Sequence, residues 1–273
     1  MVRDSVSRLS GSLKRIEFRS RSGGMSQNFN ITGAGFQIEA PLALADNDVH
    51  LWRADLDAIR SEESLWRELL SPDELKRADR FHFDRDRQRF SAARAVLRKI
   101  LAAYLEVDPK SFNFCYSKKE KPSLGQPHSG RGISFNVSHS GGIALFAISR
   151  GREVGVDVEQ IKRDIEVEAI GRRFFSAHEQ AQLFALPTEQ QVDAFFRCWT
   201  RKESYIKATG DGLSLPLSQF DVSLAVGATD ALVATRPDAG EAEKWLLTDA
   251  ASESGFAAAL CVRGRDWILK RWA

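Results

Sequence analysis

The stretch Trp199-Thr-Arg-Lys-Glu-Ser-Tyr-Ile-Lys-Ala-Thr-Gly-Asp-Gly212 decides the fold, because it closes a long helical pattern around which the other elements can be placed. Thr188 is expected to cap the start of this helix through its hydroxyl group. Gly210 is expected to stop the helix, since glycine readily adopts the left-handed conformation found at helix C-termini. The pattern therefore predicts a helix over residues 189–209.

A carboxylate falls within the apolar face of this helix. At about 100° per residue, the apolar stripe consists of Val192, Phe195, Phe196, Trp199 and Ile206. Glu203 lies inside the stripe, and Lys207 lies on its edge one turn later. A carboxylate in apolar surroundings is costly unless it is paired, protonated or bound to a metal. The alternative is an ion pair between these two residues on the helix flank, worth about 0.2–0.5 kcal/mol.

Two further carboxylates occur in Val154-Gly-Val-Asp-Val-Glu159, which has the period of a strand. The valines face one way, while Asp157 and Glu159 face the other, roughly 7 Å apart along the strand. Gly155 is expected to leave open space beside them. A solvated strand face is the alternative, but like charges at this spacing are relieved by a cation. Together with Glu203, these acids favour an oxygen-ligand site for Mg²⁺.

Length and composition limit the protein class. The chain has 273 residues and a formal net charge of +2, which allows one large domain or two small ones. No apolar run is long enough for a membrane span, and the charge gives no general nucleic-acid footprint, so neither partner is expected. The three cysteines, Cys115, Cys198 and Cys261, lack zinc-site spacing. Reduced thiols in a cytoplasmic protein are expected.

The N-terminal segment differs from the rest of the chain. Residues 1–45 are rich in Ser, Gly, Arg and Asn, and we expect a basic, mostly disordered tail. No hydrophobic run follows the basic residues, so no secretory signal is expected, and Met25 is an alternative start. We expect an N-terminal lobe over 46–151, with contacts to a nucleotide, and a C-terminal lobe over 152–273, with the acids and the long helix.

The order of predicted elements occurs twice. Capping boxes at Ser71/Glu74 and Ser176/Glu179 each precede a short helix and then a long one. The two capping boxes are 105 residues apart, and the same shift of 105 residues places Arg98 on Glu203. The other expected elements are the long helix 86–104 and strands at 49–55, 113–116, 133–138, 143–149, 153–159, 219–225, 231–235, 244–249, 256–262 and 266–271. We predict an α+β fold of two similar α/β lobes related by a pseudo-two-fold axis, with the acids facing the first lobe across a cleft.

Basic and hydroxyl groups of the first half are expected to lie opposite the acids. They include Arg77 on the first short helix and the loop Lys118-Lys-Glu-Lys-Pro122. Such groups often belong to a solvated surface, and a lone histidine is often structural. Ser138-His139-Ser140 precedes Gly141-Gly142, where exposed backbone is expected to bind an anion. Acids facing phosphate-binding groups indicate Mg²⁺-dependent phosphoryl-type transfer on a diphosphate ester. Neither the P-loop motif nor the dinucleotide glycine motif is present.

The combination resembles the Sfp-type 4′-phosphopantetheinyl transferases. The matching pieces are Gly155-Val-Asp-Val-Glu159, Trp199-Thr-Arg-Lys-Glu-Ser-Tyr-Ile-Lys207 with Gly210-Asp-Gly-Leu-Ser-Leu-Pro216, Phe135-Asn-Val-Ser-His-Ser140, and Arg173-Phe-Phe-Ser176. The resemblance implies a monomer of the phosphopantetheinyl transferase fold, of the holo-[acyl-carrier-protein] synthase type. It implies transfer of phosphopantetheine from coenzyme A (CoA), held in the cleft, to a serine of an apo acyl or peptidyl carrier protein, releasing adenosine 3′,5′-bisphosphate.

The resemblance also implies residue roles. Mg²⁺ would be held by Asp157, Glu159 and Glu203. The catalytic residues would be Glu203 as the base, Lys207 at the diphosphate or leaving group, and His139. Contacts to CoA would come from Arg77, Lys121, Ser138, His139 and Lys207. Two positions depart from the family pattern, since Glu120 replaces a common glycine and Glu74 replaces a lysine.

Two other functions remain open from the residues alone. The same acids could activate water in a metal-dependent hydrolase of nucleotide diphosphate esters. A non-catalytic module that binds carrier proteins could keep the fold without the chemistry, although the complete acid set with Lys207 argues against it.

Overall fold

The computed structural model describes residues 30–31, 38–39, 41–117, 119, 121–210, 212–251 and 253–272. Most of the expected 1–45 tail lies outside these residues, as does Glu120. Within that segment, the described side chains of Ile38 and Leu44 are buried in the core. None of the helices in the described ranges has the length and apolar composition to cross a membrane.

The described chain mixes helices and strands. The helices are α1 (Leu56–Ile59), α2 (Glu63–Arg67), α3 (Pro72–Ala78), α4 (Asp84–Leu105), α5 (Val167–Phe174), α6 (Ala177–Ala185) and α7 (Thr188–Thr209). The strands are β1 (Asn30–Ile31), β2 (Ile38–Glu39), β3 (Asp48–Asp55), β4 (Phe114–Tyr116), β5 (Pro122–Leu124), β6 (Ile133–Ser140), β7 (Ile143–Arg150), β8 (Val154–Gln160), β9 (Phe220–Val222), β10 (Leu232–Thr235), β11 (Trp245–Asp249), β12 (Phe256–Arg263) and β13 (Ile268–Trp272). The predicted long helices and strands are therefore present, while α1, α2, α5, β1, β2 and β5 were not predicted.

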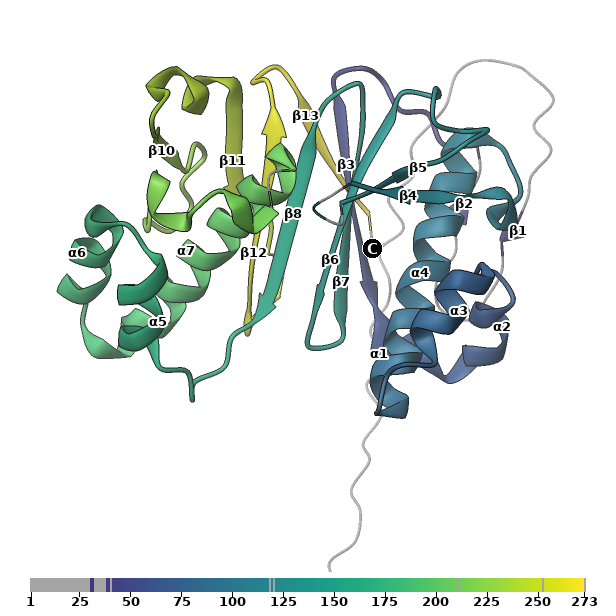
Figure 1. Ribbon diagram of the computed structural model, residues 1–273, viewed down its shortest axis with the longest axis horizontal. Coiled ribbons are helices and arrows are strands. Elements are labelled where there is room, and N and C mark those ends of the chain that lie inside the picture. Colours follow the sequence, from purple (N-terminus) through teal and green to yellow (C-terminus); the bar gives the residue numbers. More distant parts are fainter. Residues whose placement is uncertain are drawn as a thin grey trace, which may run out of the picture.

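Two main sheets meet in the middle of the molecule, with α4 and α7 on its outer sides (Figure 1). The strand order is β13-β3-β7-β6 in one sheet and β11-β12-β8 in the other. Alternate residues of the central strands enter different clusters: Leu51 lies in the cluster shared by the two sheets, and Trp52 lies in the cluster with α4. Both faces of these strands are therefore buried.

β8 shows the predicted alternation. Val154, Val156 and Val158 belong to the cluster between the sheets. The alternate residues face α7, so the three apolar side chains fix which face of the strand carries the acids. Asp157 is only 3% exposed, which excludes a solvated strand face at this position.

Helix α7 begins and ends close to the predicted residues. Its N-cap is Pro187, which makes no side-chain capping bond, so the predicted capping role of Thr188 is wrong and Thr188 is the first helical residue. Gly210 ends the helix with φ of 77°, as predicted. The C-terminal half of α7 therefore lies against β8 with a defined end.

Both predicted capping boxes are confirmed. Each glutamate also binds a buried cation of the following long helix: Glu74 pairs with Arg98, and Glu179 pairs with Lys202. Arg98 and Lys202 therefore make the same kind of buried ion pair, and Glu203 is the residue that follows Lys202. Because Lys202 takes the buried position, Glu203 is left free to line the pocket described below.

The last described strand returns to the first sheet. β13 pairs in parallel with β3, with Trp272 opposite Trp52. Their rings stack with centroids 4.9 Å apart. The sheet built mainly from residues 48–150 therefore includes a strand from the end of the described chain.

Candidate active site

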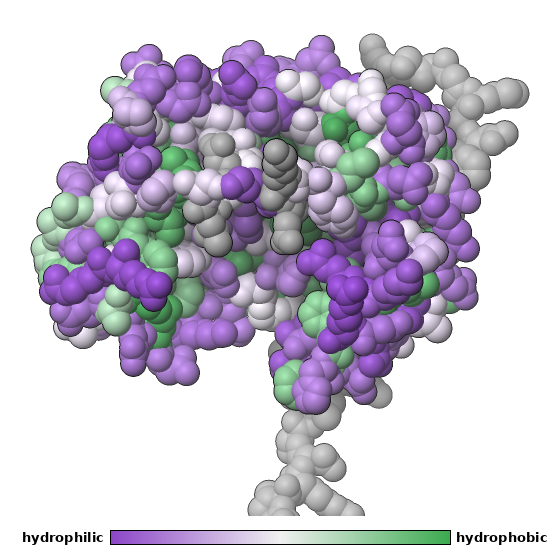
Figure 2. All heavy atoms as spheres, in the orientation of Figure 1, coloured by the Kyte–Doolittle hydropathy of each residue, from purple (hydrophilic) through white to green (hydrophobic). Residues whose placement is uncertain are grey.

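Residues from β6, β8 and α7 line a pocket of about 420 Å³. The lining residues are Val137, Ser138, His139, Asp157, Glu159, Trp199, Glu203 and Lys207. All three predicted acids are therefore brought together with Lys207, Ser138 and His139. Hydrophilic side chains cover most of the periphery of the face seen in Figure 2, and a notch opens at its lower edge between the two halves.

Gly155 brings the helix and the strand together. A Cβ atom at this position would lie 2.1 Å from the Ser204 carbonyl oxygen and 2.3 Å from the Ala208 nitrogen, both in α7. The expectation of open space beside the acids is therefore wrong, because the helix backbone fills it. This close approach places Glu203 and Lys207 opposite Asp157.

The Asp157 carboxylate has two different oxygens. Oδ1 accepts hydrogen bonds from Ser138 Oγ at 2.9 Å and Lys207 Nζ at 2.6 Å. Oδ2 is buried and has no hydrogen-bond partner within the described residues. A buried acceptor without a donor is costly. Lys207 thus pairs across to β8, and Oδ2 remains open to a further positive group.

The other two carboxylates ionise with difficulty. Desolvation raises the pKa of Glu203, and the negative charges of Asp157 and Glu159 raise it further, against the opposing effect of Lys207. Desolvation also raises the pKa of Glu159, although a hydrogen bond from Ser140 opposes this. Negative charge is therefore concentrated in the pocket beyond what Lys207 offsets, a condition that a bound cation would relieve.

The donor set suits a hard divalent cation, since all three acids offer oxygen ligands. Across the described ranges, however, no three His, Cys, Asp or Glu side chains are grouped closely enough to hold a metal ion as they stand. Instead, the Asp157 carboxylate forms an ion pair with the Lys207 ammonium group. The open Oδ2 of Asp157 and the raised pKa values fit a cation, and the three-acid ligand set remains a prediction.

His139 lies in a cationic part of the site. Its pKa is lowered by desolvation and then by the positive charges of Lys207, Arg77 and Arg89. The imidazole is therefore held neutral more firmly than usual, and the surrounding cations suit an anionic group.

The turn after His139 is only partly open. His139 and Ser140 belong to β6, and Gly141 and Gly142 form the turn with φ of 56° and 93°. A Cβ at Gly141 would lie 2.4 Å from Gln160 Oε1, and one at Gly142 would lie 2.7 Å from Asp57 Oδ2. The expected exposure of this backbone holds at Gly141 but not at Gly142, which is buried with the Asp57 carboxylate against it.

Two residues that were predicted to contact CoA, Lys121 and Ser138, instead form hydrogen bonds to other groups of the protein. Lys121 Nζ donates to the carbonyl oxygens of Val154 and Ala208 at 3.3 and 2.9 Å, and its pKa is lowered by desolvation. Ser138 Oγ bonds to Asp157, Lys207 and the Val158 nitrogen. Lys121 therefore ties its loop to the end of α7 and lies outside the pocket lining.

Arg77 is exposed on α3 and also lies outside the pocket lining. Its guanidinium group lies over the Phe90 ring, 5.5 Å from the centroid. Its positive charge contributes, after desolvation and Lys207, to lowering the pKa of His139. Arg77 is thus near the cationic end of the site without facing the acids.

The sequence assigned no site role to Trp199, and it placed Ser140 only in the polar cluster before the glycine turn. Ser140 Oγ donates to Glu159 Oε2 at 2.7 Å, and Trp199 lines the pocket although it was assigned to the apolar stripe. The spacing of Asn136, Ser138 and Ser140, all polar at every second position of a strand, was the available signal.

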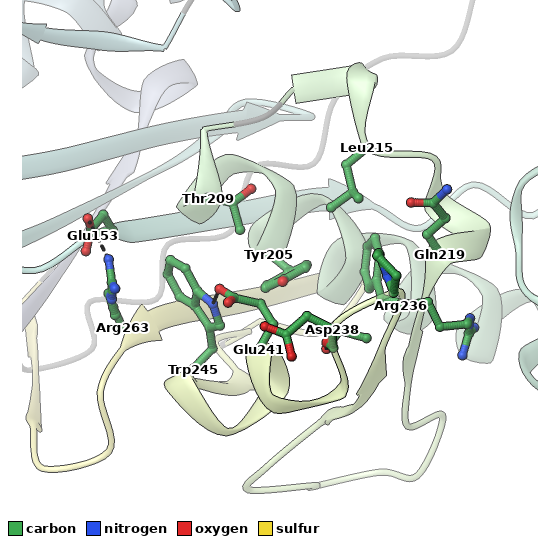
Figure 3. A pocket seen from close by; sticks show the side chains of 13 residues that line it. Glu153, Tyr205, Thr209, Leu215, Gln219, Arg236, Asp238, Glu241, Trp245 and Arg263 are labelled. Carbon is green, nitrogen blue, oxygen red and sulfur yellow. Dashed lines mark hydrogen bonds and ion pairs between the residues drawn. The ribbon is translucent and has the colours of Figure 1, made fainter.

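A second hollow, of about 340 Å³, lies between the end of α7 and the segment from β10 to β11 (Figure 3). Tyr205 and Trp245 contribute aromatic walls. Within it, Arg263 binds Glu153, and Trp245 Nε1 donates to Glu241. None of the predicted site residues lines it, so the chemistry is assigned to the first pocket.

Comparison with known proteins gives matches over both halves of the chain. The family described as "4'-phosphopantetheinyl transferase, N-terminal" matches residues 56–150, and the "4'-phosphopantetheinyl transferase superfamily" matches residues 153–261. The 4'-phosphopantetheinyl transferase HetI of Nostoc sp. is 39% identical over 85% of this chain and 94% of its own. The 4'-phosphopantetheinyl transferase Sfp of Bacillus subtilis is 33% identical over 60% and 71%. The human L-aminoadipate-semialdehyde dehydrogenase-phosphopantetheinyl transferase is 29% identical over 72% and 68%.

Proposed function

The chain belongs to the 4′-phosphopantetheinyl transferase superfamily, and we propose that it transfers the phosphopantetheine group of CoA to a serine of an acyl or peptidyl carrier protein. The observation that carries this proposal is the pocket in which Asp157, Glu159, Glu203 and Lys207 meet. It combines oxygen ligands for a cation with an ammonium group, which is the equipment needed to act on a diphosphate.

Asp157, Glu159 and Glu203 are proposed to hold Mg²⁺ against the diphosphate of CoA. The unpartnered Oδ2 of Asp157 and the raised pKa values of the two glutamates support this assignment. A divalent cation in this position would neutralise charge on the diphosphate oxygens. Lys207, now on Asp157, would then be released toward the phosphate groups.

Glu203 is proposed as the base for the carrier serine. The serine oxygen attacks the phosphorus on the pantetheine side of the diphosphate and forms the new ester bond, while its proton passes to the Glu203 carboxylate directly or through water. The bond from this phosphorus to the bridging oxygen breaks, and adenosine 3′,5′-bisphosphate leaves. The raised pKa of Glu203 supports this role, because a more basic carboxylate accepts a proton more readily.

Lys207 is proposed to stabilise the leaving group or to protonate it. Its ammonium group lies 2.6 Å from Asp157 and is part-exposed to the pocket. His139 and Arg77 are proposed to contact the CoA phosphates, supported by the cationic surroundings of the imidazole. Ser138 and Lys121 would make such contacts only by exchanging their present hydrogen bonds for bonds to CoA.

We propose that the two halves, 46–151 and 152–273, are lobes related by a pseudo-two-fold axis, with β13 returning to the first. The two capping boxes with their buried ion pairs support this relationship. We further propose a monomer of the holo-[acyl-carrier-protein] synthase type that works in the cytoplasm. The free state of Cys115, Cys198 and Cys261 supports a reducing compartment.

Incubation with an apo carrier protein, CoA and Mg²⁺ tests the function. Transfer predicts that the carrier protein gains the mass of one phosphopantetheine group, located on serine by fragmentation. Consumption of CoA without this gain would indicate a hydrolase. Binding of the carrier without either change would indicate a non-catalytic module.

A further inference from the structure

Polar side chains of β6 take the place of a backbone ladder along the edge of β8. Asn136 Oδ1, Ser138 Oγ and Ser140 Oγ accept hydrogen bonds from the backbone nitrogens of Val156, Val158 and Gln160 at 2.9, 3.3 and 3.2 Å. The two strands belong to different sheets. The bonded residues occur at every second position of both strands, because side chains on one face of a strand repeat every two residues. The joint between the sheets is therefore built from side chains.

Two of these side chains also bind the acids. Ser138 donates to Asp157 Oδ1 at 2.9 Å, and Ser140 donates to Glu159 Oε2 at 2.7 Å. A hydroxyl group has one proton to donate, and the hydrogen bond that its oxygen accepts from the backbone N–H group fixes the position of that oxygen. Each serine thus connects the backbone of β8 to one carboxylate. Asn136 makes the same kind of joint, but its amide bonds to neither acid in the structure.

We propose that Ser140 is a positioning residue that holds the Glu159 carboxylate in the orientation needed to bind a divalent cation. The inference rests on the proposed function, since it concerns one of the three proposed ligands. Ser140 is better suited to a test than Ser138, because Ser138 also accepts a hydrogen bond from Lys207. Loss of the Ser140 hydroxyl affects the orientation of Glu159 alone among the three acids.

Loss of this hydroxyl is expected to weaken cation binding. Glu159 is repelled by Asp157 and only partly buried, so without the bond from Ser140 its side chain can turn toward water. Groups that orient a metal ligand typically contribute about 10–100-fold to metal affinity. The fold should persist, because Gln160 is exposed and water can accept from its freed N–H group.

The test compares Ser140→Ala, Ser140→Thr and Asn136→Ala in the full chain. Mg²⁺ is titrated calorimetrically into each protein with CoA present, and the Mg²⁺ dependence of transfer is measured separately. Ser140→Ala should raise the Mg²⁺ concentration at half-saturation by about tenfold or more in both measurements. Ser140→Thr, which keeps the hydroxyl, should restore it, and Asn136→Ala should leave it within about twofold of the parent protein.

Several results would overturn the inference. They are an unchanged Mg²⁺ half-saturation in Ser140→Ala, no restoration by threonine, an equal rise in Asn136→Ala, or no Mg²⁺ binding by the parent protein. If Asn136→Ala does not fold, Ser134→Ala on the same strand serves as the control. Absence of transfer by the parent protein with normal Mg²⁺ binding would reject the proposed function, while the calorimetric comparison would still decide the role of Ser140.

Discussion

Lys202 Nζ lies 2.6 Å from Glu179 Oε1, and both side chains are fully buried. Lys202 also donates to the Phe220 carbonyl oxygen at 2.7 Å, and Glu179 also accepts from the Val222 nitrogen at 2.8 Å. Buried charges are tolerated only when their hydrogen bonds are satisfied. This pair therefore fixes α6, the middle of α7 and β9 relative to one another, directly beside the residue that enters the site.

Replacing Lys202 with methionine should reduce the free energy of unfolding by about 3–5 kcal/mol, because it leaves Glu179 charged and buried without its cation. Urea denaturation followed by circular dichroism measures the change. Lys76→Met is the matched control, since Lys76 is 75% exposed and lies 4.0 Å from Asp73. It should alter stability by less than about 0.5 kcal/mol. Equal effects of the two substitutions would show that the buried pair is not important for stability.

Gly155→Ala should destabilise the protein by about 1–3 kcal/mol or more, because its methyl group would overlap the α7 backbone. Displacing α7 should also reduce transfer, since Glu203 and Lys207 would move away from Asp157. Gly130→Ala is the control, as a Cβ there meets nothing within 4 Å. Thermal denaturation and the transfer assay measure both effects. A Gly155→Ala protein as stable and active as the parent would contradict the close packing described here.

Asp157→Asn should abolish most transfer while leaving the folded state intact. The amide keeps the shape of the side chain but loses the charge that binds Lys207 and the proposed cation. A loss of about 100-fold or more is expected in the rate of carrier modification, at the level reported for groups that stabilise developing charge. Circular dichroism checks the fold. Normal turnover at ordinary Mg²⁺ concentrations would exclude Asp157 as a ligand.

Glu203→Gln should lower kcat by roughly 10²–10⁴-fold, the usual contribution of a general base. Binding of CoA in the absence of Mg²⁺ should persist, because the proposed phosphate contacts of His139 and Arg77 do not involve Glu203. At neutral pH the metal-free variant should melt at a higher temperature than the parent, since it removes a desolvated charge repelled by Asp157 and Glu159. Calorimetric CoA binding and thermal denaturation measure these effects. A kcat within twofold of the parent would exclude Glu203 as the base.

The acidic limb of the pH–rate profile should lie above the ordinary glutamate pKa of 4.5, because the pKa values of Glu159 and Glu203 are raised. Glu159 and Glu203 also affect the free energy of unfolding. Their stabilising contribution is fully present below pH 4.5, where both are protonated, and it is lost as the pH rises through their raised folded-state pKa values. Higher Mg²⁺ concentrations should move the rate limb to lower pH, because cation binding favours the deprotonated acids. A limb that does not respond to Mg²⁺ would contradict this coupling.

Local chemistry explains which features could be predicted from the sequence. The capping boxes at Ser71 and Ser176 depend on residues three positions apart, and the alternation in β8 depends on the period of a strand. Gly210 ends α7 because of its own conformational freedom. These features need no knowledge of distant contacts, so the main elements and the face carrying Asp157 and Glu159 were accessible.

The remaining features depend on which surfaces meet in three dimensions. Gly155 was interpreted as open space because the sequence does not show that α7 lies on it. Lys121 was assigned to CoA, yet its ammonium group binds carbonyl oxygens of β8 and α7. The hydrogen bond from Ser140 to Glu159 was not predicted, because it requires β6 and β8 to lie edge to edge. The short helices α1, α2 and α5 were missed for a related reason: packing stabilises them more than their own sequences do.

The parallel pairing of β13 with β3 makes the molecule hard to divide. A fragment ending before residue 268 would leave the outer edge of β3 uncovered, and a fragment beginning after residue 151 would carry a strand with no neighbour to pair with. Neither part of the chain is therefore a self-sufficient module. If such a protein is split for complementation, or if one half is exchanged with that of a relative, β13 should be kept together with the sheet that contains β3.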